Sequence, residues 1–221
     1  GLAGVVNSYE LSGENAVLGR RNRVLEGSAQ IEEAIGDLRY RVSSSSFFQV
    51  NVTIVARIFA FLEARLTPPR PIVDLYCGAG TFALFFAARG CTVTGIEENP
   101  RAVREARENA ALNGVRLGLG MGRLGLTVAD GAADALVQRR APYDLVIANI
   151  LAGPLIELAP DIAAIAAAKS QLVLAGLLGT QARAVARAYR RQGYRLAERL
   201  DLGDWAILRL IKRGWFGIQL R

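Results

Sequence analysis

From Arg70 onward, short aliphatic runs typical of strands alternate with longer segments of helical periodicity. Such alternation predicts an α/β fold in which helices cover both faces of a mainly parallel, doubly wound sheet. The last two apolar runs have no helical segment between them, so we expect an antiparallel hairpin at or near an edge of the sheet. The expected strands are 71–77, 91–97, 125–130, 143–150, 170–178, 194–202 and 204–213, and the expected helices are 81–90, 99–114, 151–168 and 181–193.

The N-terminal segment has a different pattern and is expected to form a small β extension. The runs 5–10 and 16–21 flank a turn-forming segment, which predicts a hairpin. An alternating run at 37–43 predicts another strand, and a helix is expected over 47–66 because its apolar residues recur at helical spacing. The two expected units are an N-terminal β extension, 1–46, and the main domain, 47–221.

The composition excludes several kinds of site. The chain has no histidine, which removes Ser-His-Asp triads, Cys-His dyads and histidine-based metal sites. Two cysteines, Cys77 and Cys91, cannot form a four-thiolate zinc site, so we expect no metal. A pair of cysteines could form a disulfide, but without a secretory context we expect two free thiols. No apolar run reaches the roughly 18 residues that span a bilayer. The first residues also lack a signal-peptide pattern, and we therefore expect a soluble cytoplasmic protein with no membrane partner.

The chain is basic, with a net charge of +7 that is carried almost wholly by arginine. A basic surface favours RNA or another polyanion as a partner. Arginine-rich helix faces that are simply solvated explain the charge equally well, and both interpretations stay open.

A glycine-rich turn follows the first expected strand of the main domain. Gly78 and Gly80 permit a tight turn and close approach of a ligand, and the helix that follows begins with unpaired N–H groups. Glu97 ends the next strand, where a carboxylate accepts hydrogen bonds from ribose hydroxyls. The third glycine of the dinucleotide fingerprint is absent, which favours a smaller polar group than pyrophosphate. The alternative is that the glycines only form a turn and Glu97 only caps a helix.

These motifs resemble class I S-adenosylmethionine-dependent methyltransferases, through DLYCGAGTF, GIEENP and ARENAALNG. The N-terminal half also resembles the bacterial uracil-C5 methyltransferases of ribosomal and transfer RNA, through LRYRVSSSSFFQVN and VDLYCGAGTFAL. The resemblance implies S-adenosylmethionine as the cofactor. It also implies that the cofactor is contacted by four residues of this half, Gln49, Tyr76, Thr81 and Glu97.

From about residue 126 the chain resembles a different enzyme, which trimethylates amino groups on a large-subunit ribosomal protein. The matching stretches are TVADG, APYDLVIANILAGPLIELAPDIA and DWAILRL. This resemblance implies that Asp130 lies near the adenine and that Asn149 faces the transferable methyl group. The irregular segment 116–126 lies between the two halves, and we interpret it as the junction of a chimera.

The resemblance to the uracil enzymes breaks down where their chemistry is located. Their cysteine nucleophile follows the fifth strand, where this chain has Ala175 and Gly176. Amine methylation needs no such thiol, because positioning and exclusion of water supply much of the acceleration. Asn149 is therefore the expected catalytic residue, as an acceptor of a hydrogen bond from the amine; a helix cap is its alternative role.

We thus expect an S-adenosylmethionine-dependent methyltransferase that modifies an amine of a ribosomal protein. A uracil-C5 methyltransferase acting on ribosomal or transfer RNA, and an inert scaffold that only folds or binds cofactor, are the alternatives. The residues expected to line the site are Gln49, Tyr76, Gly78, Gly80, Thr81, Glu97, Asp130 and Asn149.

Overall fold

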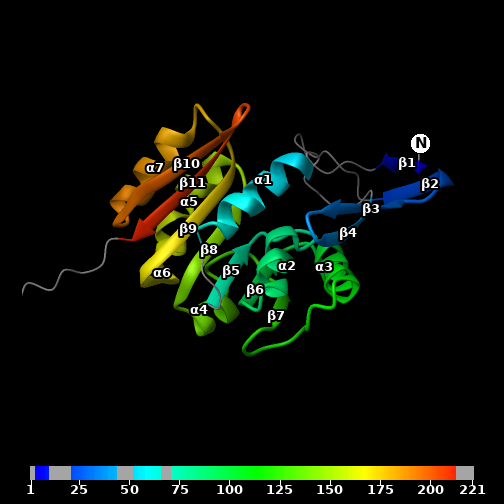
Figure 1. Cartoon of the computed structure of the whole chain (residues 1–221), viewed down its shortest axis with the longest axis horizontal. Helices are drawn as coiled ribbons and strands as arrows, with labels where there is room; N and C mark the ends of the chain where they lie inside the picture. The colour runs from blue at the N-terminus through cyan, green and yellow to red at the C-terminus, as the bar shows by residue number, and fades with distance from the viewer. Residues whose placement is uncertain (1–2, 10–20, 44–51, 66–70, 213–221) are drawn as a thin grey trace, which may run out of the picture.

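The structure is a computed structural model of the 221-residue chain. It describes residues 3–9, 21–43, 52–65 and 71–212. The described residues form one seven-stranded sheet covered by helices and two N-terminal hairpins (Figure 1). The strands are β1 Gly4–Tyr9, β2 Arg21–Gly27, β3 Gln30–Ile35, β4 Leu38–Ser43, β5 Pro71–Leu75, β6 Thr92–Glu97, β7 Leu124–Val128, β8 Tyr143–Asn149, β9 Ala166–Leu178, β10 Tyr194–Leu202 and β11 Trp205–Lys212. The helices are α1 Val52–Glu63, α2 Thr81–Ala88, α3 Pro100–Leu112, α4 Ala135–Arg140, α5 Ala152–Glu157, α6 Ala159–Ala164 and α7 Ala182–Arg191.

The main sheet has the strand order β10-β11-β9-β8-β5-β6-β7. Strands β5 to β9 pair in parallel, whereas β11 runs antiparallel to both of its neighbours, β9 and β10. The expected α/β class and the antiparallel edge hairpin are therefore confirmed. The order changes direction beside β5, where β6 and β8 flank it, and open α/β sheets bind their ligands at such a point.

Both faces of the sheet are buried, because successive residues of each central strand point to opposite sides. In β8, Leu145 and Ile147 join a cluster with α1, α2 and β4. Val146 and Ala148 join a second cluster with α5, α6 and α7. This two-sided burial explains why the central strands are almost continuously apolar.

The N-terminal hairpins differ in detail from the expected ones. β1 pairs antiparallel with β2, so its partner strand lies later in the chain than the expected run 16–21. β3 was not expected, because its sequence QIEEAI lacks a regular alternation of apolar and polar residues. It pairs with β4, and the buried side of β4 belongs to the same core cluster as α1 and α2.

The expected helix over 151–168 is wrong at its C-terminal end. Two short helices, α5 and α6, replace its first part, and β9 begins already at Ala166. The main-chain N–H of Tyr143 donates to the carbonyl of Ile165 at 2.9 Å, and Ala166 is in register with Tyr143. Alanine has a high helix propensity, but here sheet pairing decides its conformation. The short helix α4 was also not expected.

Candidate cofactor site and acceptor edge

The carboxyl ends of the parallel strands bring most expected site residues to one edge of the sheet. Tyr76 directly follows β5, Glu97 ends β6 and Asn149 ends β8. Asp130 follows β7 by two residues. Because β7, β6, β5 and β8 are consecutive neighbours in the sheet, these four residues lie at one edge, where ligands of open α/β sheets bind.

Glu97 connects the glycine turn to the next strand. Its Oε2 accepts a hydrogen bond from the Gly78 N–H at 3.0 Å, and its Oε1 accepts one from the Asn99 N–H at 2.9 Å. A carboxylate oxygen can accept two hydrogen bonds, so each oxygen keeps one acceptor position. The α3 cap is Asn99, whose side chain accepts from the Arg101 N–H at 2.9 Å. Glu97 is therefore not the helix cap.

The turn itself uses left-handed backbone conformations. Gly78 and Gly80 have φ of 55° and 89°, and Tyr76 has φ of 61°. A side chain at Gly80 would place Cβ 3.1 Å from a Leu84 methyl and 3.2 Å from Ala106 Cβ. The glycine thus permits close packing of α2 against α3. Tyr76 is the one non-glycine residue with positive φ in the described part of the chain, and such a conformation costs roughly 1–2 kcal/mol.

Tyr76 is held by the residues after β7. A Cβ atom at Gly131, which has φ of 70°, would lie 2.4 Å from the Tyr76 hydroxyl. Partial burial, followed by the charges of Asp130 and Glu98, raises the pKa of Tyr76. The hydroxyl therefore stays neutral at physiological pH. The neighbouring carboxylates make this end of the site electronegative, which suits a cationic ligand.

Asp74 is a site residue that the sequence reasoning missed. Its side chain is 1% exposed within β5, and its Oδ2 accepts a hydrogen bond from the Ala83 N–H at 2.8 Å. It thereby holds the first turn of α2, where N–H groups have no helical partner. Burial raises the pKa of Asp74 to about 8, against the lowering effect of the Ala83 hydrogen bond. An acid inside an otherwise apolar strand was the signal that could have revealed it.

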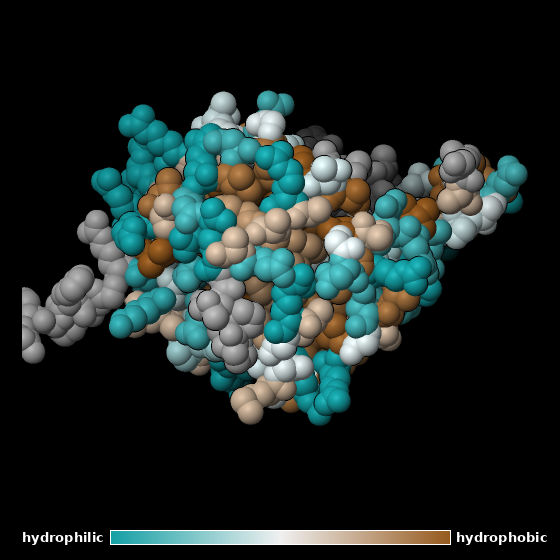
Figure 2. All heavy atoms as spheres, in the orientation of Figure 1, coloured by the Kyte–Doolittle hydropathy of each residue, from teal (hydrophilic) through white to brown (hydrophobic). Residues whose placement is uncertain are grey.

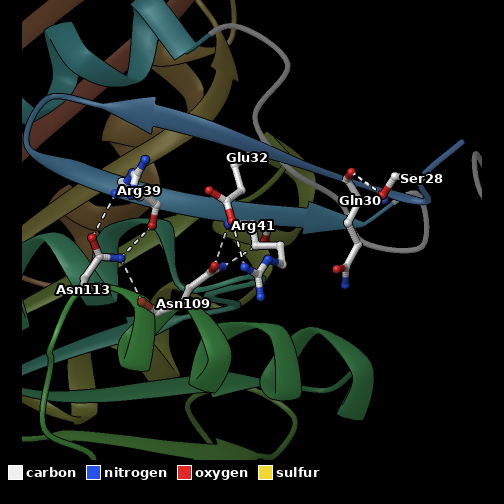
Figure 3. A network of polar contacts seen from close by, with 7 residues as sticks. All are labelled: Ser28, Gln30, Glu32, Arg39, Arg41, Asn109 and Asn113. Atoms are coloured by element: carbon white, nitrogen blue, oxygen red, sulfur yellow. Dashed lines mark hydrogen bonds and ion pairs between the residues drawn. The ribbon is translucent and has the colours of Figure 1, made fainter. Parts of the chain in front are cut away.

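Asn109 of α3 and Asn113, which caps the C-terminal end of this helix, attach the β3–β4 hairpin to the main domain (Figure 3). Asn113 accepts from the Arg39 N–H at 2.9 Å and donates to the Arg39 carbonyl at 2.6 Å. Asn109 accepts from the Arg41 N–H at 2.7 Å and donates to the Arg41 carbonyl at 3.1 Å. Asn109 also donates to the Ala79 carbonyl at 3.1 Å, inside the glycine turn. One fully buried side chain therefore connects the hairpin, α3 and the turn.

Two further contacts support the same turn. The Tyr40 hydroxyl donates to the carbonyl of Thr81, the first residue of α2, at 3.0 Å. The Thr81 residue is itself buried. Ser43 contacts the buried carboxylate of Glu105 on α3. The β3–β4 hairpin is thus hydrogen-bonded to α2, which follows the glycine turn, and to α3, which packs beside it.

The carboxyl ends of β8 and β9 lie on the other side of β5. We call this part of the sheet the acceptor edge, because the methyl acceptor is expected there. Asn149 is in register with Ala175 and is partly exposed. Within the described residues, its side chain has no hydrogen-bond partner. Helix α5 begins after Leu151, which occupies the cap position without a side-chain bond. The alternative role of Asn149 as a helix cap is therefore not supported by the geometry.

Close backbone packing explains the missing thiol at the end of β9. A Cβ atom at Gly176, which has φ of 79°, would lie 2.7 Å from the Ile150 carbonyl oxygen and 2.9 Å from its nitrogen. Both cysteines are free and buried, as expected. Burial raises the pKa of Cys77 well above its usual range, so its reactive thiolate is disfavoured.

The profile of one protein family, ribosomal protein L11 methyltransferase (PrmA), matches residues 56–213. The chain belongs to the ribosomal protein L11 methyltransferase family. Similar curated sequences include uncharacterized RNA methyltransferases. One from Clostridium acetobutylicum is 36% identical over 117 residues, which are 52% of this chain and 25% of that protein. One from Oceanobacillus iheyensis is 39% identical over 103 residues, 46% of this chain and 22% of that protein. The chain thus spans about a quarter of the length of these curated relatives.

Solved structures show the same fold. The ribosomal protein L11 methylase of Lactobacillus delbrueckii subsp. bulgaricus has a TM-score of 0.65 and 24% identity, over 76% of this chain and 82% of that one. The Pyrococcus abyssi tRNA (uracil-54, C5)-methyltransferase, solved with S-adenosyl-L-homocysteine, has a TM-score of 0.65 and 20% identity, over 91% of this chain and 49% of that one. Both expected resemblances are confirmed, and the fold is that of class I methyltransferases.

The family's cofactor is S-adenosylmethionine, and the geometry of the turn fits it. Gly78 is partly exposed in the turn, and each carboxylate oxygen of Glu97 keeps one acceptor position that fits a ribose hydroxyl. The carboxylates around Tyr76 complement a sulfonium cation. Among the described residues, no cluster of three or more metal-ligating side chains occurs, and no helix is long and apolar enough to cross a membrane.

The expected site residues lie in different parts of the structure. Tyr76, Gly78, Glu97 and Asp130 lie at the cofactor side of the sheet edge, and Asn149 lies at the acceptor side. Gly80 and Thr81 shape the start of α2 from a more buried position. Gln49 lies outside the described residues. The binding roles of all these residues, and the junction within 116–126, stay predictions.

Proposed function

We propose that this chain is an S-adenosylmethionine-dependent N-methyltransferase that modifies an amine of a ribosomal protein. The observation that carries the proposal is the acceptor edge, where the partly exposed Asn149 pairs with β9 and where Gly176 of β9 has no room for a side chain. The match to the ribosomal protein L11 methyltransferase family supports the same substrate class.

Cofactor binding is assigned to the residues of the turn and the neighbouring strands. Glu97 would accept the ribose hydroxyls, and the N–H groups of the turn and of the start of α2 would face the amino-acid end. Asp130 would accept from the adenine amino group, and Tyr76 would pack beside the adenosine. When bound, S-adenosylmethionine supplies an electrophilic methyl group on a sulfonium.

Asn149 acts on the incoming amine. The amine must arrive neutral, because only its nitrogen lone pair can form the new N–C bond as the methyl's bond to sulfur breaks. The Asn149 Oδ1 accepts a hydrogen bond from the amine N–H and so orients the lone pair toward the methyl. The exposed side chain of Leu151, 68% accessible, contributes apolar surface that excludes water from the cation when substrate covers it.

Uracil-C5 methylation of RNA is the second candidate, and the RNA methyltransferase relatives favour it. It requires a cysteine nucleophile that attacks the base. Both cysteines of this chain are buried; Cys77 follows β5, Cys91 precedes β6, and neither belongs to β8 or β9. The chemistry of the acceptor edge therefore favours the amine.

Methyl-tritium transfer separates the candidates. The full chain is incubated with labelled S-adenosylmethionine and with ribosomes, whose proteins and RNA are then separated. The proposal expects label in protein, as methylated amino groups. Label at uracil C5 would overturn it, and no label in either fraction, with cofactor bound, would favour the inert scaffold.

The cofactor assignment has its own test, Glu97→Gln. This variant keeps one side-chain oxygen but loses the charge and half of the acceptor positions, so we expect S-adenosylmethionine affinity to fall about 10-fold, equivalent to about 1.4 kcal/mol. Isothermal titration calorimetry measures the affinity, and Glu108→Gln, at an exposed position of α3, is the matched control. Equal affinity for Glu97→Gln and the unaltered chain would remove Glu97 from the site.

A further inference from the structure

A groove between α7 and the β10–β11 hairpin lies apart from the cofactor site. Its volume is about 650 Å³. Alanine and leucine side chains form the floor of the groove, and four arginines lie along its rim. The lining residues are Ala182, Arg183, Ala186, Arg187, Arg190, Leu196, Arg199 and Leu208. In Figure 2, hydrophilic residues surround a smaller hydrophobic patch in this part of the surface.

Three of the rim arginines form one line. Arg183, Arg187 and Arg190 follow the spacing i, i+4 and i+7, which places them on one face of a helix over about 10 Å. All three are exposed, and none forms an ion pair with a carboxylate of the described residues. The fourth, Arg199, pairs with Asp201 at 2.6 Å. The α7 side of the groove thus presents uncompensated positive charge.

The groove begins near the acceptor edge. Helix α7 starts at Ala182, four residues after Leu178, where β9 ends. In β9, Ala175 is the register partner of Asn149. Among the three arginines of α7, Arg183 is therefore the nearest to the carboxyl ends of the strands, and Arg190 lies toward their amino ends. A chain that lies in the groove would lead away from the place where methyl transfer is expected.

We propose that this groove binds the phosphate backbone of an RNA strand that adjoins the methyl acceptor. The proposal rests on the proposed function, which places the methyl acceptor at the ends of β8 and β9. Guanidinium groups bind phosphate bidentately. An evenly spaced line of cations without interleaved acids matches a strand with one charge per nucleotide.

The test is fluorescence anisotropy of a labelled single-stranded RNA, about 20 nucleotides long, titrated with the full chain at several salt concentrations. Arg187→Glu combined with Arg190→Glu is expected to weaken binding at least about 10-fold. It is also expected to reduce the slope of log K against log salt by about 1.4, which corresponds to two lost phosphate contacts. The assay contains no cofactor, so its result does not depend on methyl transfer.

The matched control is Arg139→Glu combined with Arg195→Glu, which changes the net charge equally at exposed positions outside the groove. It is expected to retain RNA affinity within about 2-fold. Equal weakening by both double variants would reduce the effect to net charge and overturn the proposal. So would competition by poly-glutamate as effective as that by unlabelled RNA, which would point to an acidic protein partner. If the groove variant does not fold, as judged by thermal unfolding, the single variant Arg187→Ala takes its place, with Arg195→Ala as control.

Discussion

The two halves of the main sheet are stabilised in different ways. In the cofactor half, β5, β6 and β7 with α2 and α3, buried polar side chains bond directly to the backbone of the glycine turn and its neighbours. In the acceptor half, β8 to β11 with α5 to α7, the interior is almost wholly apolar. Of the six polar or charged residues that are buried in the described part of the chain, Ser170 alone belongs to the acceptor half.

The difference corresponds to what each half has to bind. A cofactor site requires its first contacts to be held within a fraction of an ångström, which directional hydrogen bonds achieve. The acceptor edge instead leaves Asn149 without a bonded partner and Leu151 exposed. We infer that the cofactor half is preorganised and that the acceptor half adapts to a macromolecular substrate. The following variants test this contrast.

The largest effect is expected from Asp74→Asn, in the cofactor half. Burial raises the folded-state pKa of Asp74 to about 8, from its ordinary value of 3.8. The protonated form thus stabilises the fold fully below about pH 4, and this contribution is lost as pH rises toward 8. Asparagine keeps an acceptor for the Ala83 N–H without a charge.

As pH rises from about 5 to about 8, we therefore expect the free energy of unfolding of the unaltered chain to fall, relative to that of Asp74→Asn, by on the order of 4 kcal/mol. Urea denaturation at the two pH values measures this gain. Asp144→Asn, at a half-buried position of β8, is the control. A constant difference across the pH range would show that Asp74 does not titrate in the fold.

Gly176→Ala tests the packing of the acceptor half. The new Cβ would lie 2.7 Å from the Ile150 backbone, and the alanine would have to adopt a φ of 79°. We therefore expect a loss of about 3 kcal/mol in the free energy of unfolding. Gly193→Ala is a matched control, because its φ is 85° and no atom lies within 4 Å of its Cβ position. It should cost about 1 kcal/mol. Equal losses would mean that the Ile150 contact is not tight.

Asn149→Ala separates catalysis from cofactor binding. Loss of the hydrogen bond to the amine should lower kcat about 100-fold, or about 2.7 kcal/mol. Stability should change little, because the Asn149 side chain bonds no described residue. Calorimetry with S-adenosylmethionine is the accompanying measurement, and its affinity should be retained. A parallel fall in affinity would place Asn149 among the cofactor residues instead.

Asn109→Ala and Asn113→Ala compare two similar asparagines one helical turn apart. Asn109→Ala should cost about 2 kcal/mol in stability, since it leaves buried backbone groups unpaired. It should also lower S-adenosylmethionine affinity, because Asn109 bonds the Ala79 carbonyl in the turn. Asn113 bonds Arg39 but not the turn, so its variant should lower stability alone. Equal affinities for both variants would exclude Asn109 as a positioning residue.

Local signals made the cofactor half predictable. Asn99 and Pro100 begin α3 as expected, and Gly114 follows its end with φ of 65°. The strand–turn–helix around Gly78 and Gly80 could be placed for the same reason. The hydrogen bond from the Gly78 N–H to Glu97 could not be predicted, because it depends on how β5 and β6 approach each other in space.

The remaining differences have physical reasons too. The alanines after Ile165 suit a helix by propensity, but tertiary pairing places them in β9. β3 belongs to a two-stranded sheet, and its sequence lacks a clear apolar alternation. Gly176 could be noted as the absence of a cysteine, but only the structure reveals that the Ile150 backbone occupies the space beside it.

The amides of Asn109 and Asn113 have a consequence beyond the site. Together they bond the N–H and carbonyl groups of Arg39 and Arg41 on the side of β4 that faces away from β3, much as a third strand would. An open strand edge is a template for pairing with another chain. With this edge of β4 occupied by side chains of the same molecule, no strand of another chain can pair with it.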